Sequence, residues 1–91
     1  MRFTWDPRKA AANVRKHGVT FEEAVTVFAD PLALLVTDAV EADREILIGE
    51  SVVRRVLVTV FIEIGAEEAR IVSARRATKS ERRRYEEGQE E

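Results

Sequence analysis

The chain has 91 residues, 45% of them hydrophobic and 35% charged, a composition typical of one small globular domain with a single core. It contains no cysteine and one histidine, which excludes a disulfide framework, a thiolate metal site and a multi-histidine zinc site. No run of about 18 apolar residues is present, so we expect no membrane span, and the N-terminus lacks the apolar stretch of a signal peptide. The absence of cysteine fits a reducing compartment, and we expect a cytoplasmic protein.

The first elements predicted along the chain are a short strand over residues 2–5 and a helix that follows it. Asp6 is placed to cap the first free amides of the helix, and Pro7 fits its first position. Gly18 is the expected stop, because glycine commonly follows the last turn of a helix. The last turn is basic, which favours the helix dipole.

A second helix is expected directly afterwards. Thr20 and Glu23 have the spacing of a capping box. Apolar residues then recur with the period of one helical face, at Phe21, Ala24, Val25 and Phe28. The Asp-Pro pair at 30–31 is expected to end this helix.

Four strands are predicted after Pro31, because β-branched residues dominate there, over residues 32–37, 45–48, 55–62 and 69–75. Both faces of the third of these strands are mostly apolar, which is typical of a central strand. The connections over residues 49–54 and 63–68 are too short for a crossover helix, so the last three strands are expected to form an antiparallel meander.

A final helix through about residue 87 is indicated by a second capping box, Thr78 with Glu81, and a frayed tail is expected over residues 88–91. The predicted order is β-α-α-β-β-β-β-α in a single domain over residues 1–91, an α+β fold with a mainly antiparallel sheet flanked by helices. We expect the helices on one face of the sheet and an open face opposite, towards which strand-end arginines could project.

Charge is distributed unevenly behind the net value of −2. Residues 1–17 carry +4 and residues 70–84 carry +6, whereas residues 18–69 carry −8 and the last seven residues −4. If the two basic segments meet in space, they form a cationic face on an acidic body. Such a face fits a polyanion or an acidic protein partner equally well.

Arginine is the residue type that carries the chemistry here. Guanidinium groups bind phosphate bidentately and stay charged, and they stabilise a pentacoordinate phosphate more than its ground state. Each candidate also has a simpler interpretation: Arg75 and Arg76 as solvated charge at a turn, Arg44 in a local ion pair with its acidic neighbours, Arg55 as a strand-end charge. His17 is otherwise a helix-dipole residue.

Taken together, the chain resembles the BrnT family of bacterial type II toxins, which are small RelE-like ribonucleases. The resemblance covers nearly the whole sequence and is carried by segments in a fixed order: FTWDPRKA at 3–10, Asn13, KHG at 16–18, FEEA at 21–24, VFADP at 27–31, REILIG at 44–49, RVLV at 55–58, RIVSARRAT at 70–78, ERR at 81–83 and YE at 85–86. Many relatives have Gly-Glu-Glu before the arginine that aligns with Arg44, whereas this chain has Glu-Ala-Asp at 41–43.

The resemblance implies a RelE-like fold and metal-independent RNA cleavage by 2′-hydroxyl attack, without a cofactor, that inhibits translation. It also implies neutralisation by a BrnA-like antitoxin with a ribbon-helix-helix DNA-binding domain, in a heterotetramer. The catalytic candidates on this basis are Arg44, Arg55, Arg75, His17 and, as a base, Asp43. The RNA-binding candidates are Lys9, Arg76, Lys79, Arg82 and Arg83. The alternative is a non-catalytic module whose cationic face binds nucleic acid or docks a partner, and it would bind RNA without cutting it.

Overall fold

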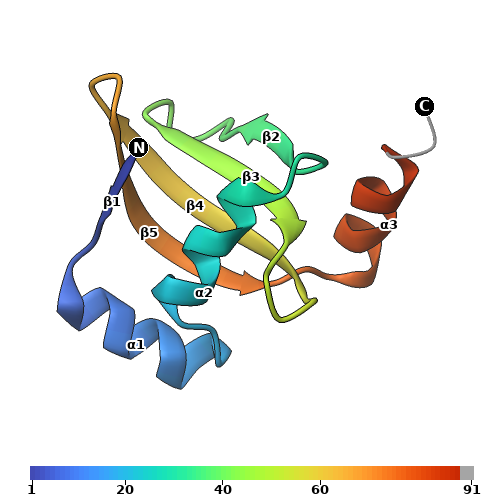
Figure 1. The fold of residues 1–91 in the computed structure, drawn as a ribbon, viewed down its shortest axis with the longest axis horizontal. Helices are drawn as coiled ribbons and strands as arrows, with labels where there is room; N and C mark the ends of the chain where they lie inside the picture. The colour runs from blue at the N-terminus through green and yellow to red at the C-terminus, as the bar shows by residue number, and fades with distance from the viewer. Residues whose placement is uncertain (89–91) are drawn as a thin grey trace.

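The computed structural model describes residues 1–88 and has the α+β architecture expected from the sequence (Figure 1). Its elements are β1 (Arg2–Thr4), α1 (Pro7–His17), α2 (Phe21–Thr26), the 3₁₀ helix η1 (Val27–Ala29), β2 (Leu34–Thr37), β3 (Arg44–Glu50), β4 (Val56–Ile64), β5 (Glu68–Arg76) and α3 (Lys79–Glu87). The helices and strands follow the predicted order, except that the last turn of the second helix tightens into η1. Gly88 closes α3, and residues 89–91 of the tail that we expected to fray lie outside the described residues.

The ends of α1 form as the local sequence dictates. The Asp6 carboxylate accepts the Arg8 backbone N–H at 2.8 Å, and Pro7 occupies the first turn. At the other end Gly18 adopts a φ of 68°, a left-handed conformation that favours glycine, and donates its N–H to the Val14 carbonyl at 2.8 Å. No helix within residues 1–88 is long and apolar enough to cross a membrane.

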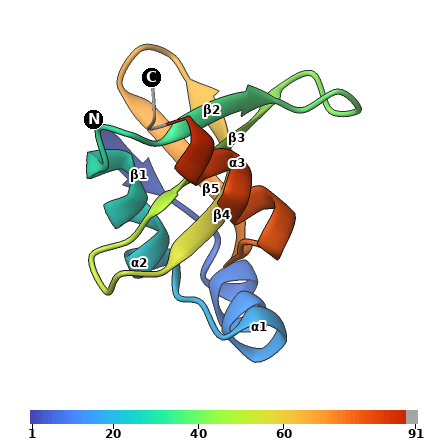
Figure 2. The same ribbon diagram turned by 90° about the vertical axis from the view of Figure 1, so that its right-hand side faces the viewer.

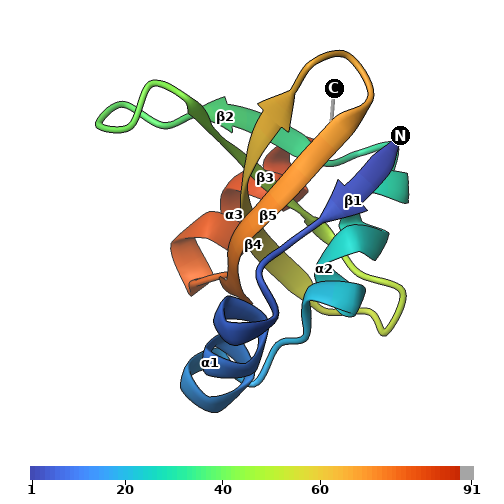
Figure 3. The same ribbon diagram turned by 90° about the vertical axis from the view of Figure 1, so that its left-hand side faces the viewer.

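One five-stranded sheet runs through the molecule in the order β1-β5-β4-β3-β2. Strands β2 to β5 are antiparallel neighbours, which confirms the meander predicted for the last three of them, and β1 pairs with β5 in parallel (Figure 3). Strand β4 is central, in agreement with its two apolar faces. The register between β4 and β5 slips after Val60, which pairs with Ser73, while Phe61 pairs with Ile71; Val72 is therefore the extra residue of a β-bulge.

The main core lies between the sheet and the layer of α1 and α2. Fully buried Phe21 and Val27 from the helical layer meet Leu57 of β4 and Ile71 of β5. Aromatic rings extend this core towards β1, because the Phe28 ring lies 4.8 Å from that of Phe3 and 4.9 Å from that of Phe61, centroid to centroid. This core holds α1 and α2 against the sheet, mainly against β5.

Helix α3 covers part of the opposite face of the sheet, so the expectation that this face is open is wrong for that part (Figure 2). The chain leaves β5 at Ala77 and turns back over the sheet, where buried Tyr85 packs against Ile48 of β3 and Val58 of β4. The charged composition of α3 concealed this packing, since Tyr85 is its one buried residue. The far part of this face, around Ile62, is not fully covered.

Replacing Tyr85 with phenylalanine should loosen α3. The Tyr85 hydroxyl donates to Asp30 Oδ2 at 2.5 Å, and the same oxygen accepts the Glu50 N–H at 2.9 Å. We expect the free energy of unfolding to fall by about 1 kcal/mol. Relative to the wild type, amide exchange should speed up more within α3 than in the rest of the protein. Chemical denaturation and hydrogen exchange measure both. Unchanged exchange in α3 would show that the hydroxyl does not hold the helix.

Candidate active site

A cationic cavity lies at the end of the sheet where β4 begins and β5 ends. It has a volume of about 310 Å³ and is lined by Glu50, Arg54, Arg55, Val56, Arg76, Ala77, Arg82 and Glu86. Because β4 and β5 are antiparallel neighbours, the start of one and the end of the other reach the same edge, and α3 folds back to add its arginine. Larger hollows of about 800 and 720 Å³ elsewhere are lined by one arginine and by none. Of these three hollows of the described residues 1–88, the 310 Å³ cavity has the phosphate-binding chemistry.

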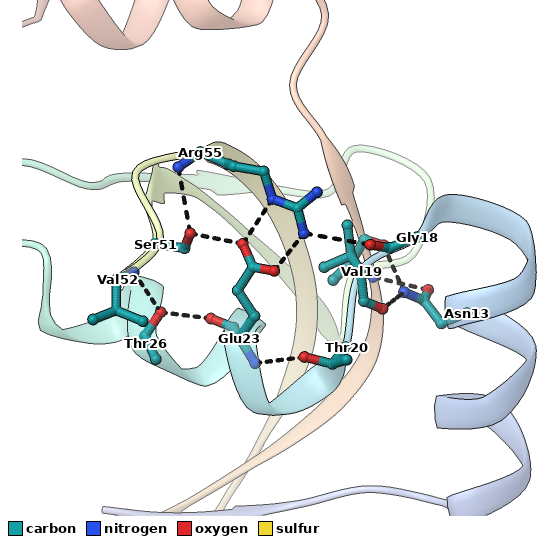
Figure 4. Close-up of polar contacts among 10 residues, drawn as sticks. Asn13, Gly18, Val19, Thr20, Glu23, Thr26, Ser51, Val52 and Arg55 are labelled. Carbon is teal, nitrogen blue, oxygen red and sulfur yellow. Dashed lines mark hydrogen bonds and ion pairs between the residues drawn. The ribbon is translucent and has the colours of Figure 1, made fainter.

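Arg55 is held at this cavity by a two-pronged ion pair with Glu23 of α2 (Figure 4). Its Nε donates to Glu23 Oε2 at 3.0 Å, and its Nη2 donates both to Glu23 Oε1 and, at 3.3 Å, to the Gly18 carbonyl. The Ser51 hydroxyl donates to Glu23 Oε2 at 2.7 Å. These bonds fix the orientation of the guanidinium. The Arg55 side chain remains 29% exposed, so the guanidinium is still reachable from solvent.

The ion pair takes Glu23 away from the role that the sequence predicts for it. Thr20 accepts the Glu23 backbone N–H at 3.0 Å, which is one half of the expected capping box. The reciprocal half is not formed, because the Glu23 carboxylate turns towards Arg55 and Ser51 instead (Figure 4). The Glu23 carboxylate of α2 therefore binds Arg55, at the start of β4, instead of capping its own helix.

The electrostatics of the pair keep both partners charged. The hydrogen bond from Arg55 lowers the pKa of Glu23 below its ordinary value of 4.5, and it outweighs burial, which acts in the opposite direction. Ser51 and the charges of Arg55 and Arg76 lower that pKa further. The hydrogen bond to Glu23 in turn raises the pKa of Arg55. Glu23 is therefore ionised at neutral pH, and the charge of Arg76 reaches it.

The end of α1 is fixed beside Arg55 by a buried asparagine. The Asn13 amide donates to the Val19 carbonyl at 2.9 Å and to the Ala74 carbonyl at 2.7 Å, and its oxygen accepts the Ala74 N–H at 3.1 Å. These bonds tie α1, the loop after Gly18 and β5 together. These bonds therefore also position the Gly18 carbonyl, which accepts a hydrogen bond from Arg55.

The β3–β4 turn that precedes Arg55 contains a strained residue. Arg54 has a φ of 69°, in the left-handed region that costs a non-glycine residue on the order of 1 kcal/mol. The turn is closed by the Ser51 N–H bonded to the Arg55 carbonyl at 2.8 Å and by the Arg54 N–H bonded to the Ser51 carbonyl at 2.9 Å. The turn brings the Ser51 hydroxyl and the Arg55 side chain to the same carboxylate.

Comparison with known proteins decides the family. The profile of the ribonuclease toxin, BrnT, of type II toxin-antitoxin systems matches residues 5–81. The chain belongs to the BrnT family of ribonuclease toxins. The crystal structure of the Brucella abortus ribonuclease toxin BrnT is similar to it, with a TM-score of 0.72 and 27% sequence identity over 87% of this chain and 99% of that one. A search of curated proteins gave no match.

Three of the residues expected at a BrnT site meet at the cavity, namely Arg55, Arg76 and Arg82. Arg76 pairs with Leu57, two residues beyond Arg55, so alternation along the strand places both arginines on the α1 side of the sheet. His17 ends α1 next to Gly18, whose carbonyl binds Arg55.

Other expected residues lie elsewhere. Arg44 pairs with Ile62, six residues along β4 from its first residue, which places it about 20 Å from Arg55. Asp43 is exposed in the turn before it, and within residues 1–88 Arg44 makes no ion pair with it or with Glu45. The structure therefore does not bring together the arginines that resemblance groups as catalytic.

The RNA-binding candidates also divide. Lys9 on α1 and Lys79 and Arg83 on α3 are exposed and do not line the cavity. They remain candidates for contacts with a longer substrate outside it. No group of three or more His, Cys, Asp or Glu side chains that could hold a metal ion occurs in the described part of this BrnT-family chain.

Glu23 and Ser51 were missed by reasoning from the sequence. Glu23 already had a local role in a capping box, and Ser51 is one serine among several in a polar turn. Glu23 could have been found from its position on a helix that packs near the start of the central strand, where Arg55 lies. That inference requires the strand register, which the sequence does not give.

Arg75 is engaged on the other face of the sheet. It pairs with Val58, and its guanidinium donates to both oxygens of Glu81 on α3, at 2.7 and 2.8 Å. Glu81 also accepts the Thr78 N–H at 2.8 Å, so the predicted capping box is complete and doubles as an ion pair. In the free protein Arg75 therefore serves to attach α3.

The stability that Glu81 contributes should depend on pH. Its hydrogen bond with Arg75 lowers the pKa of Glu81 from 4.5 to about 2. A lowered folded-state pKa means that the contribution is complete above pH 4.5 and is lost as the pH falls towards 2. Replacing Glu81 with glutamine should cost about 1 kcal/mol at pH 7, since Arg75 is partly exposed and screened, and progressively less between pH 4.5 and 2. Chemical denaturation across that range checks this, and a pH-independent difference would contradict it.

Proposed function

We propose that this BrnT-family chain is an endoribonuclease that cleaves RNA without a metal ion by attack of the 2′-hydroxyl on the adjacent phosphate. The observation that carries the proposal is the cavity in which Arg55, oriented by Glu23, faces the same space as Arg76 and Arg82. Three guanidinium groups provide the positive charge that a metal ion would otherwise supply to the phosphate.

In this reaction the 2′-oxygen forms a bond to phosphorus and the bond from phosphorus to the 5′-oxygen breaks. The phosphate passes through a pentacoordinate state with increased negative charge, and Arg55 and Arg76 stabilise that charge preferentially. Glu23 acts as a positioning residue for Arg55. A base takes the 2′-hydroxyl proton and an acid delivers one to the 5′-oxygen. His17, next to Gly18, is our candidate for this transfer, because imidazole both accepts and donates protons near neutral pH.

Members of this family are toxins of type II toxin-antitoxin systems, so an antitoxin is the expected partner. We propose that this partner is a BrnA-like antitoxin with a ribbon-helix-helix domain and that the two proteins form a heterotetramer. We propose that the free chain acts in the cytoplasm and inhibits translation because it cleaves RNA there. The cationic cavity supports the proposed partner, since an acidic segment of the antitoxin would compete with RNA for it.

Incubation of the partner-free chain with bulk RNA tests the proposal. We expect cleavage at equal rates with excess chelator and with added Mg²⁺, and products that end in a 2′,3′-cyclic phosphate and a 5′-hydroxyl. Cleavage that requires a metal would contradict the mechanism. RNA that is bound but left intact would favour the alternative of a binding module without catalysis, whose affinity falls steeply with salt.

A further inference from the structure

Strand β2 forms a free edge of the sheet on the side away from β1. It pairs with β3 on one side and, within residues 1–88, with no strand on the other. Exposed edge strands are usually protected by lysine, proline or inward-pointing charges, because their unpaired amides and carbonyls bind other chains. Residues 34–37 read Leu-Leu-Val-Thr and carry none of these. The edge is short, with four residues, and no charge or proline within it opposes pairing with a neighbour.

Exposed apolar side chains gather around this edge. Leu35 in the strand is 60% exposed, and Leu32 before it and Val40 after it are 50% and 88% exposed. A groove of about 250 Å³ lies beside Leu35, and its apolar lining comes from Met1, Phe28, Ala33, Leu35, Leu47 and Phe61. An edge that offers main-chain bonds together with an apolar groove is the arrangement by which sheets recognise an extended peptide.

The charge around β2 selects the chemistry of its occupant. Residues 32–43 contain Asp38, Glu41 and Asp43 and no basic residue, and the two charged residues that line the groove, Asp30 and Glu63, are also acidic. Arg44, which follows, stands on the other face of the sheet, since Leu35 pairs with Leu47 and alternation separates 44 from 47. A second copy of this chain would bring no complementary charge from its own edge segment, because residues 32–43 contain no basic residue. A segment with basic flanks is complementary.

We infer that the antitoxin adds a strand to the free edge of β2, with an apolar side chain in the groove beside Leu35 and basic residues facing the acidic segment 32–43. The inference rests on the proposed function for the existence of this partner. The edge is separate from the cationic cavity at the ends of β4 and β5, so this contact anchors the antitoxin and another segment of it must cover the cavity. The β2 edge therefore provides affinity for the antitoxin, and coverage of the cationic cavity provides inhibition.

Two surface variants and a control test the inference on the toxin co-purified with its cognate antitoxin. Leu35→Lys and Glu41→Lys should each weaken antitoxin binding about tenfold or more, and the free variants should cleave RNA at the wild-type rate. Val14→Lys, an exposed apolar position on α1, should change neither property. Wild-type affinity of both β2 variants would overturn the inference. Absence of RNA cleavage by the wild-type chain would instead refute the proposed function alone.

Hydrogen exchange provides a test that needs no variant. The amides of residues 34–37 should exchange more slowly in the toxin–antitoxin complex than in the free toxin, since their outward N–H groups become bonded. Protection confined to the cationic cavity or to α3 would overturn the inference. Sedimentation of the wild-type chain alone should show a monomer. A dimer that Leu35→Lys dissociates would mean that the occupant of the edge is a second copy.

Discussion

Replacing Arg55 with alanine is expected to lower the rate of RNA cleavage by about 100-fold to 1,000-fold, as loss of one preorganised charge at a reacting phosphate does elsewhere. The orientation of Arg55 in the cavity is fixed by three hydrogen bonds, two to Glu23 and one to the Gly18 carbonyl. Arg55→Lys keeps the charge but loses the planar fork, so we expect it to recover only part of the rate. Single-turnover cleavage of a defined RNA measures both.

Two further variants sharpen this experiment. Arg8→Ala removes the same charge from an exposed position in the first turn of α1, and it should cleave at the wild-type rate. Arg44→Ala distinguishes the two possible locations of catalysis, because Arg44 lies about 20 Å away along the sheet. A large loss with Arg44→Ala and a small one with Arg55→Ala would move the active site to the other end of the sheet. Thermal denaturation of each variant excludes unfolding as the cause.

Replacing Asn13 with alanine should destabilise the protein by about 2–4 kcal/mol, the second large effect that we expect. The substitution leaves the buried Ala74 N–H and the Ala74 and Val19 carbonyls without their partner, and each buried unsatisfied group costs about 1–3 kcal/mol. Alanine is the better helix former, so propensity alone would predict the opposite sign. Urea denaturation measures the change in the free energy of unfolding.

Asn13→Asp is the matched variant for this experiment. A carboxylate still accepts the Ala74 N–H but faces two carbonyls to which it cannot donate, so we expect it to be destabilised as well. Arg15→Ala, on the exposed side of the same helix, should be close to neutral. Wild-type stability of Asn13→Ala would mean that water replaces the amide, and α1 would then not be fixed through this residue.

Sequence reasoning located the elements well where their signals are local. The limits of α1 follow from Asp6, Pro7 and Gly18, and the start of α3 from the capping box of Thr78 with Glu81. Each of these signals acts between residues no more than four apart, so no knowledge of the rest of the chain is needed. The central position of β4 was also readable, since a strand that is apolar on both faces must be covered on both.

The site was only partly predictable. The sequence identified Arg55, Arg76 and Arg82 as candidates for phosphate chemistry, and the structure places them around one cavity. It grouped Arg55 with Arg44 and Arg75 as catalytic and placed Arg76 and Arg82 among the RNA-binding residues, because residue type does not show which arginines share a cavity. Nor could it show that Arg75 holds α3 through Glu81.

What the sequence by itself determined is the class of fold, the limits of most elements and, through segments in a fixed order, membership of the BrnT family. Only the tertiary structure decided that α3 crosses to the second face of the sheet and that Glu23 meets Arg55, 32 residues away. The physical reason is that such contacts depend on strand register and on where a turn directs the following helix. Both are settled by the packing of the whole core, and no local pattern encodes them.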